Sequence, residues 1–315
     1  MVAKKQNSSP LVPVWLRDLV SWLLGPGRPV LVAAALVGVF GGGAYLAWRR
    51  IGPRILRSPE YRVGPAQVEI TPLPGWIHRN SGEFQAEVFR SPALDGPLSI
   101  MDDDLTERIA KTFKLHPWVA KVGRVTKQYP NPASVKVELV YREPVCMVDV
   151  PGWAYAVDAD GVVLPGEDFT SMEATRYPHL TGVDRKPAVQ AGGRWVDLKV
   201  VGGAKIAEAF GPAWEKMQLQ YIDALAADPA AGAAGIAGGD SPRRAMEPFF
   251  ALRTRQGSRI LWGYAPGAPI AGEIPAAEKV ARLQQYFAEN DTLDGPQGQR
   301  QDLDVRVLGK GATSR

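Results

Sequence analysis

The sequence predicts an α+β protein with a single N-terminal transmembrane helix, a small strand–helix–strand–strand domain, and then a β-rich domain with an antiparallel sheet and flanking helices. Three observations predict this order. Residues 29–48 carry no charged side chain, residues 105–141 change from helical spacing to a period of two, and short apolar alternations recur from 153 to 307. At 315 residues, with 45% hydrophobic and 22% charged residues, the composition is globular and excludes wholesale disorder.

The net charge of +4 is unevenly distributed along the chain. Up to Arg62 there are nine basic and two acidic residues, whereas the remainder has 28 basic and 31 acidic residues. The body of the protein therefore lacks the basic excess that nucleic-acid binding requires. Cys146 is the single cysteine, which excludes an intrachain disulfide framework and a cysteine-based zinc site.

The uncharged stretch between Arg28 and Arg49 has the length of a membrane span. As a helix, Val30 to Trp48 extends about 28 Å, close to the thickness of a hydrocarbon core. A buried globular helix and a cleaved signal peptide are the alternatives, but a signal peptide with this n-region would be unusually long. We expect an uncleaved single-pass anchor over 29–48, after a tail at 1–28.

The charges that flank the span do not determine its orientation. More arginines follow the span than precede it, and a literal count places the C-terminal body in the cytoplasm. Long domains are translocated largely regardless of such charges, so both orientations stay open on this ground.

Small residues recur within the span at four-residue spacing, namely Ala34, Gly38 and Gly42. Such a stripe allows a second transmembrane helix to approach closely. Chance spacing in an Ala/Gly-rich anchor is the alternative interpretation, so the three residues are candidate transmembrane packing positions.

Between Ser58 and Leu98, frequent prolines and glycines separate short apolar alternations, and we expect strands at 68–70 and 84–89. Three consecutive aspartates, Asp102 to Asp104, then precede a helical pattern over 105–115. We interpret them as caps for the free amides of the helix start rather than as metal ligands, because no matching ligand set follows.

Leu105, Ile109 and Phe113 share one face of this helix and predict its buried side. Two runs with a period of two follow at 122–128 and 135–141, and the segment YPNPA reverses the chain between them.

The remaining segments alternate between strand and helix patterns. We expect a hairpin over 154–165 that turns at its Asp-Ala-Asp-Gly segment, and a second hairpin over 249–263 that turns at Gln256-Gly257. The expected elements, a mobile insertion included, are a helix at 203–214 with Ile206, Ala207 and Phe210 on one face, a strand at 217–225, the insertion at 229–242, and a helix at 274–290 with Val280, Leu283 and Phe287 inward and Lys279 and Arg282 outward.

Side chains suited to catalysis are few. The histidines are His78, His116 and His179, and we expect a packing or capping role for His116. Cys146 lies on an apolar alternation typical of a buried strand. No nucleophile elbow, zinc-binding His pair or phosphate loop occurs, so we expect no catalytic, cofactor or metal site. A membrane-tethered enzyme would need a pocket with convergent polar groups.

The segment HPWVAKVGRVTKQYPNPASVKVELVYREPVCMV, residues 116–148, resembles the end of the POTRA domain in the FtsQ/DivIB family of bacterial cell-division proteins. A helix leads to a Pro-Trp turn, a strand, a "YP" turn and a second strand with a Pro-Val exit. Later segments, including YPHLTG at 177–182 and LDVRV at 303–307, are similar to that family, so the resemblance covers about residues 102–309. It implies a POTRA domain at 58–143, an FtsQ-type β domain at 144–309 and a tail at 310–315.

The resemblance also implies the function. Members of the family are non-catalytic scaffolds in the inner membrane at the division septum, with a cytoplasmic N-terminus and extracytoplasmic domains. They link other divisome membrane proteins and bind the small bitopic proteins FtsB and FtsL, and neither a nucleic acid nor a small-molecule substrate is implied. A POTRA-bearing envelope factor, a docking module for secretion or outer-membrane assembly, is the alternative.

The partner-binding edge implied by the resemblance is carried over to five positions of the last strand, Leu303, Asp304, Val305, Arg306 and Val307. An extended partner segment adds to such an edge through main-chain hydrogen bonds. We expect Arg306 to pair with an acidic partner residue, whereas Val307 replaces the aromatic residue common at that position. The alternative is that these residues form an inner strand of the sheet.

Overall fold

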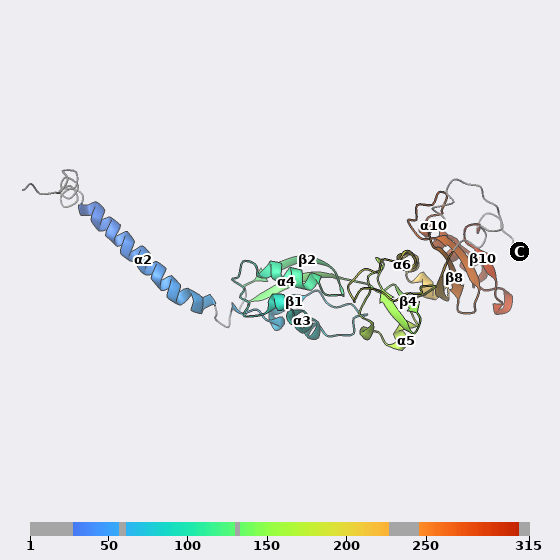
Figure 1. Ribbon diagram of the computed structural model, residues 1–315, viewed down its shortest axis with the longest axis horizontal. Coiled ribbons are helices and arrows are strands. Elements are labelled where there is room, and N and C mark those ends of the chain that lie inside the picture. Colours follow the sequence, from blue (N-terminus) through green and yellow to red (C-terminus); the bar gives the residue numbers. More distant parts are fainter. Residues whose placement is uncertain (1–27, 57–60, 130–132, 227–245, 309–315) are drawn as a thin grey trace, which may run out of the picture.

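The computed structural model describes residues 28–56, 61–129, 133–226 and 246–308. They form one long N-terminal helix and a body with two β-sheets (Figure 1). In this view the three-stranded sheet lies nearer the N-terminal helix, and the seven-stranded sheet forms the other part of the body. Residues 130–132 of the YPNPA turn and the insertion expected at 229–242 lie outside the described residues.

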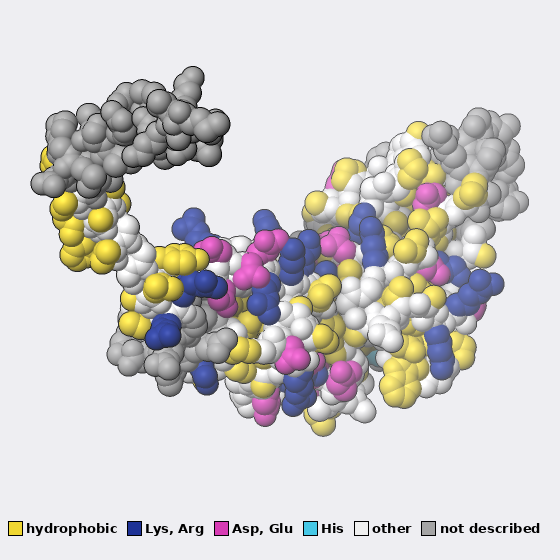
Figure 2. All heavy atoms as spheres, turned by 60° about the vertical axis from the view of Figure 1, so that its left-hand side comes forward, with side chains coloured by type: hydrophobic (Ala, Val, Ile, Leu, Met, Phe, Trp, Pro, Cys, Tyr) yellow, Lys and Arg dark blue, Asp and Glu magenta, His cyan; other side chains and the backbone are white. Residues whose placement is uncertain are grey.

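The N-terminal helix, α2, spans Arg28–Leu56. Its apolar part, Val32–Gly52, has 21 residues and a mean hydropathy of 1.3, and residues 32–51 are exposed. Hydrophobic side chains gather on this helix in Figure 2. At about 1.5 Å per residue the apolar part is about 31 Å long, enough to cross a hydrocarbon core. The expectation of one N-terminal helix with the length and apolarity of a span is confirmed, and the helix continues eight residues beyond Trp48.

The smaller sheet has the strand order β1-β3-β2, with β1 parallel and β2 antiparallel to β3. The elements of this unit are β1 (Val68–Ile70), α3 (Ser81–Phe89), α4 (Leu105–Lys114), β2 (Val119–Gln128) and β3 (Ser134–Tyr141), with short 3-10 turns η2 (Pro65–Gln67) and η3 (Pro92–Leu94). The strands predicted at 68–70, 122–128 and 135–141 are confirmed. The unit has one helix more than expected.

That helix corrects the strand predicted at 84–89, which is part of α3. Asn80 caps it, because its side chain accepts a hydrogen bond from the Glu83 amide at 2.8 Å. Phe84 and Val88, four residues apart, are both buried. Their spacing suits one helix face, and a window of only six residues did not separate it from a period of two.

The helix predicted at 105–115 is confirmed as α4, with Leu105, Ile109 and Phe113 buried. The capping role of the aspartates is wrong in its detail. Asp104 makes no side-chain capping bond, and Asp102 instead accepts a hydrogen bond from the Ser99 amide at 2.9 Å. The acidic segment thus stabilises the turn before the helix, because an aspartate side chain readily bonds nearby backbone amides.

The seven-stranded sheet has the order β10-β9-β8-β7-β6-β4-β5. Its strands are β4 (Cys146–Val150), β5 (Trp153–Val157), β6 (His179–Thr181), β7 (Leu219–Leu225), β8 (Phe249–Thr254), β9 (Arg259–Tyr264) and β10 (Asp302–Asp304). The sheet is mixed, which corrects the expected antiparallel sheet. The β4–β6, β6–β7 and β9–β10 pairs are parallel. Parallel neighbours need long crossover connections, and helices lie in the connections after β6 and β9.

The hairpin predicted over 154–165 is corrected as well. Strand β5 pairs with β4, through a turn at Pro151-Gly152. The Asp-Ala-Asp-Gly turn does form, because Asp158 accepts hydrogen bonds from the amides of Asp160 and Val162 at 3.0 and 2.8 Å. The chain that returns from it makes only isolated bridges. The hairpin predicted over 249–263 is confirmed as β8 and β9, and the strand predicted at 217–225 is confirmed as β7.

The helices of this unit are α5 (Ser171–Ala174), α6 (Leu198–Phe210), α7 (Ala213–Lys216) and α10 (Ala276–Asn290), with 3-10 turns η4 (Gly166–Asp168) and η5 (Pro296–Gly298). The helix predicted at 203–214 is two helices. Asp197 caps the start of α6 by accepting from the Lys199 amide at 2.8 Å. Gly211 ends it with a φ of +47°, a conformation that glycine adopts easily.

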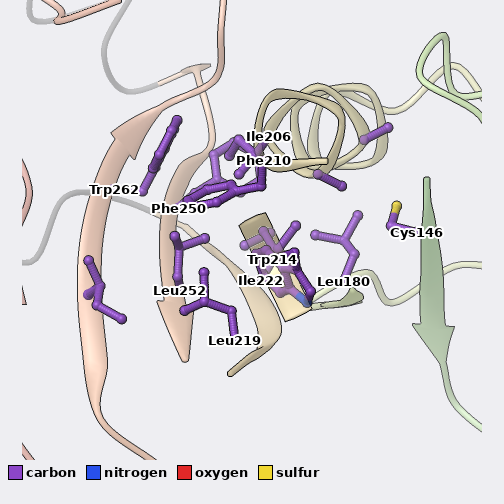
Figure 3. Packing of buried hydrophobic residues seen from close by; sticks show 14 of the residues in the cluster. Cys146, Leu180, Ile206, Phe210, Trp214, Leu219, Ile222, Phe250, Leu252 and Trp262 are labelled. Atoms are coloured by element: carbon purple, nitrogen blue, oxygen red, sulfur yellow. The ribbon is translucent and has the colours of Figure 1, made fainter. Parts of the chain in front are cut away.

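Helices α6 and α10 pack against one face of the seven-stranded sheet and enclose its core. Figure 3 shows Ile206 and Phe210 of α6 next to Phe250 of β8. Two adjacent glycines allow this close packing. A Cβ atom at Gly202 would lie 2.7 Å from the Phe250 ring, and one at Gly203 would lie 2.6 Å from Leu180. The inward face predicted for Ile206, Ala207 and Phe210 is confirmed.

Strand β4 serves both cores of the body. Cys146, Val148 and Val150 point into the core under α6, whereas Met147 packs with Trp118 and other residues of the smaller unit. This division follows from the period of two along a strand. The two units therefore share strand β4, which contributes side chains to both cores. The predicted burial of Cys146 on a strand is confirmed. Burial raises the pKa of its thiol well above the usual range, which disfavours the reactive thiolate.

Candidate functional site

The last strand, β10, lies at one end of the seven-stranded sheet. It pairs in parallel with β9, and Leu303 lies opposite Ile260. Among the described residues β9 is its only neighbour in the sheet. Within the described part of the chain, β10 is therefore an edge strand and not an inner strand. An edge strand of this kind presents one row of backbone groups away from its sheet.

The backbone of β10 divides into inward and outward groups. Gln301 accepts from the Arg259 amide at 2.9 Å, and Val305 donates to the Leu261 carbonyl at 3.2 Å. Because backbone groups alternate along a strand, Asp302 and Asp304 direct theirs away from β9. The outward row thus consists of the Asp302 amide and carbonyl and the Asp304 amide.

The strand is shorter than predicted. Only Leu303 and Asp304 of the five candidate residues belong to it, and Val305, Arg306 and Val307 form the turn that follows. Asp304 causes this end, because its side chain accepts from the Arg306 amide at 2.9 Å. Its carbonyl also accepts from the Val307 amide at 3.1 Å. An aspartate that bonds the backbone two residues later typically starts a turn.

Of the three apolar candidates, only Val307 is accessible. Leu303 and Val305 are buried in the core of the seven-stranded sheet, whereas Val307 is 48% exposed. A partner at this edge therefore meets outward backbone groups and the Val307 side chain. Leu303 and Val305 hold the strand on the body instead.

Arg306 already has a partner within the chain, and its pairing with an acidic partner residue stays a prediction. Its guanidinium bonds the Asp304 carboxylate through two nitrogens, Nε at 2.9 Å and Nη2 at 2.8 Å. Its Cζ atom also lies 5.3 Å from the centre of the Phe249 ring. This bidentate geometry is the strong form of an arginine–carboxylate pair. Because Asp304 and Arg306 are only two residues apart, this pair can form within the turn that follows β10.

Helix α10 fixes the turn after β10 from behind. Arg282 donates to the carbonyls of Val305 and Arg306 at 3.3 and 3.1 Å, and to Glu278 at 2.6 Å. The prediction that Arg282 points outward is therefore wrong. A guanidinium has several donors in one plane, so one side chain can bond both carbonyls.

Lys279 is the second residue of α10 for which the outward prediction is wrong, since it is only 1% exposed. Its Nζ atom donates to the Trp262 carbonyl at 2.7 Å and to the Glu273 carboxylate. Burial lowers the pKa of this amine, and hydrogen bonding to Glu273 partly opposes that shift. Its spacing from Leu283 and Tyr286, four and seven residues on, is the sequence signal that could have placed Lys279 on the apolar face.

The three histidines have separate roles. His116 is buried, and its Nδ1 atom accepts from the Trp118 amide at 3.3 Å, so the packing or capping role predicted for it is confirmed. His179 lies with Nδ1 3.0 Å from the Asp149 carboxylate, and the hydrogen bond to Asp149 raises its pKa. His78 lies 2.7 Å from Glu173.

Ala34, Gly38 and Gly42 lie on α2 at intervals of four residues, and all three are exposed. A Cβ atom at Gly38 or Gly42 would meet no atom within 4 Å. The packing role of this stripe against another helix stays a prediction.

No group of three or more His, Cys, Asp or Glu side chains that could hold a metal ion occurs among the residues the structure describes. The described residues line a hollow of about 460 Å³ near Arg142 and Trp214 and one of about 790 Å³ beside β5. A comparison with models of known protein families finds no match, and a search of curated proteins also finds none.

Proposed function

We propose that this chain is a non-catalytic, membrane-anchored scaffold of the bacterial cell-division machinery, as its resemblance to the FtsQ/DivIB family implies. In this proposal α2 is an uncleaved anchor in the inner membrane, with a cytoplasmic N-terminus. The body lies outside that membrane, with residues 58–143 as a POTRA domain and 144–309 as the partner-binding β domain. Its work is recruitment of other division proteins.

The observation that carries the proposal is the position of β10 at the edge of a sheet in a chain with an apolar N-terminal helix. Outward backbone groups on Asp302 and Asp304 suit the addition of an extended segment, in which main-chain bonds supply affinity. The exposed Val307 adds one apolar contact. The partners are small bitopic proteins of the FtsB and FtsL type, which would be anchored in the same membrane as α2.

Replacement of Asp302 by proline tests this edge. Asp302 is exposed, is the first residue of β10, and directs its amide outward, so proline removes a donor without loss of a bond to β9. Asp302→Ala is the matched control, because it keeps the amide. Val305→Pro is less informative, because the Val305 amide bonds Leu261. Binding is measured with the purified extracytoplasmic segments of FtsB- and FtsL-type proteins and the full chain in detergent.

We expect Asp302→Pro to weaken binding at least tenfold and Asp302→Ala to have little effect. Equal binding by both variants contradicts the β10 edge as the partner site. Two cell experiments test the wider proposal. External protease applied to spheroplasts should digest the body, and a fluorescent fusion should gather at the septum. Protection of the body contradicts the orientation, and a diffuse envelope signal favours a docking role in secretion or outer-membrane assembly.

A further inference from the structure

The opposite end of the seven-stranded sheet is formed by β5, and its outer side is only partly covered. The Met147 amide of β4 donates to the Pro178 carbonyl, so the backbone of Met147 faces β6. Its opposite residue on β5 is Ala156, whose carbonyl accepts from the Leu164 amide at 2.8 Å on the side away from β4. Because backbone groups alternate along a strand, Ala154 also faces outward.

The bond from Leu164 covers this edge only at Ala156. Among the residues that the structure describes, no hydrogen bond joins another segment to the backbone of Ala154. Ala154 is exposed, so its amide and carbonyl face solvent at an edge that already pairs with a neighbour two residues on. An extended segment placed beside Ala154 would continue the pairing that Leu164 begins.

A hollow of about 790 Å³, here called the β5 groove, runs along this open edge. Its lining comes from both faces of β5, including Trp153, Tyr155, Ala156, Leu164, Phe169 and Val189. Trp153 is 62% exposed at the mouth of the groove. Large aromatic residues of this kind are enriched among the residues that dominate the binding energy of protein interfaces.

The β5 groove carries one charge. Glu167 is the only charged side chain among the described lining residues, and its side chain is 71% exposed. Among the described residues Arg79 forms an ion pair with it, with Nη2 3.6 Å from the Glu167 carboxylate, a distance longer than a hydrogen bond. Arg79 instead bonds Glu87 and Asp168. Glu167 is therefore available to a basic residue of an incoming segment.

We propose that the β5 groove is a second docking site, which takes an extended segment of a partner protein as an added strand beside Ala154. The segment carries apolar side chains at alternate positions, which contact Trp153 on one face, and a lysine or arginine on the opposite face that meets Glu167. This site and the β10 edge lie at opposite ends of one sheet, so the same body can bind two partners at once. The site does not depend on the proposed role in division.

The test uses the full chain in detergent micelles and three synthetic peptides. The first is Thr-Val-Lys-Val-Thr-Val, the second has glutamate in place of lysine, and the third has proline at the central valine. Binding of the lysine peptide should slow deuterium exchange at residues 153–156 and change tryptophan fluorescence. The proline peptide should bind at least tenfold more weakly, because it lacks a ladder donor and resists strand pairing.

Two pairs of variants locate the site. Ala154→Pro removes the outward amide and should weaken binding of the lysine peptide at least tenfold, whereas Ala154→Ser keeps the amide and should leave this binding unchanged. Glu167→Lys should weaken binding of the lysine peptide several-fold and strengthen binding of the glutamate peptide. Glu138→Lys, an equal charge change at an exposed position of β3, should leave both unchanged.

Each contrary result overturns the proposal. These results are no binding of any peptide, equal binding of the proline peptide, exchange protection at β10 instead of β5, and equal effects of the two charge changes. Sedimentation of the full chain tests whether a second copy of the chain occupies the β5 groove. If the chain self-associates and Ala154→Pro abolishes that association, the β5 groove pairs with a second copy and the partner segment is excluded. As a control for folding, Ala154→Pro must show the same deuterium exchange in β7 to β9 as the unchanged chain. The comparison of the lysine and proline peptides uses the unchanged chain, so it tests the proposal even if this variant does not fold.

Discussion

The indole nitrogen of Trp118 donates a hydrogen bond to the Asp168 carboxylate at 2.7 Å, across 50 residues of sequence. Trp118 precedes β2 of the smaller sheet, and Asp168 ends η4 beside the larger one. Arg79 bonds the second carboxylate oxygen, with its Nε atom at 2.7 Å. The two sheets are therefore held together by specific polar contacts in addition to the side chains that β4 contributes to both cores.

Replacement of Asp168 by alanine should destabilise the body by about 1–3 kcal/mol, since the buried Trp118 donor loses its partner. Glu167→Ala is the matched control. Its side chain is exposed and only loosely paired, so we expect a change within about 0.5 kcal/mol. Urea unfolding of the full chain in detergent, followed by tryptophan fluorescence, measures both. Equal effects of the two replacements would show that the Trp118–Asp168 hydrogen bond makes no specific contribution to the stability of the body.

The stability of the body should depend on pH through His179 and His116 with opposite sign. The hydrogen bond to Asp149 raises the pKa of His179 above its ordinary value of 6.5. Its contribution is therefore present below pH 6.5 and is lost as the pH rises through the raised pKa. Burial lowers the pKa of His116, so its contribution is present above pH 6.5 and is lost as the pH falls through the lowered pKa.

Urea unfolding between pH 5.5 and 8 checks this prediction with His179→Gln and His116→Asn. The loss of stability in His179→Gln should be larger at pH 5.5 than at pH 8. The loss in His116→Asn should be larger at pH 8. A loss that is the same at every pH in both variants would contradict the assigned charge states.

Lys279 and Glu273 should be energetically coupled. Lys279→Met leaves the Glu273 carboxylate, which also accepts from the Tyr264 amide at 3.0 Å, without its buried cation. We expect a loss of about 1–3 kcal/mol, because a largely buried charge is left unpaired. In the double variant with Glu273→Gln the loss should be smaller than the sum of the single losses by about 0.5–3 kcal/mol. A double-mutant cycle measures this, and strict additivity would show that the pair does not interact.

Two glycines with similar backbone conformations should differ in their response to alanine. Gly182 has a φ of +83°, and a Cβ atom there would overlap the Ala224 carbonyl oxygen. Gly152, in the β4–β5 turn, has a φ of +80° but open space around that position. Gly152→Ala should cost about 1–2 kcal/mol from backbone strain alone, and Gly182→Ala should cost clearly more because β7 must move. Similar midpoints in thermal unfolding would contradict this.

Local patterns were sufficient for elements with a long, regular period. The buried face of α4, the strands β2 and β3, and the hairpin of β8 and β9 follow from the spacing of apolar residues and from turn residues between them. The 84–89 window failed because six residues fit both periods and the cap, Asn80, lies before it. The charge of Lys279 favours an exposed position, whereas its spacing from Leu283 places its side chain on the apolar face of α10.

For the candidate edge, the chain pattern identified a final strand near residues 303–307 but not its length or its neighbours. Periodicity is a property of one segment, so it can predict an apolar membrane-length helix and the inward side of α6 without other parts of the chain. Pairing depends on backbone groups that every residue carries alike, and so it leaves no trace in composition. Only the tertiary structure shows that β10 and β5 are the two edges of the seven-stranded sheet. It also shows that Arg306 is paired with Asp304 and that β4 contributes side chains to two cores.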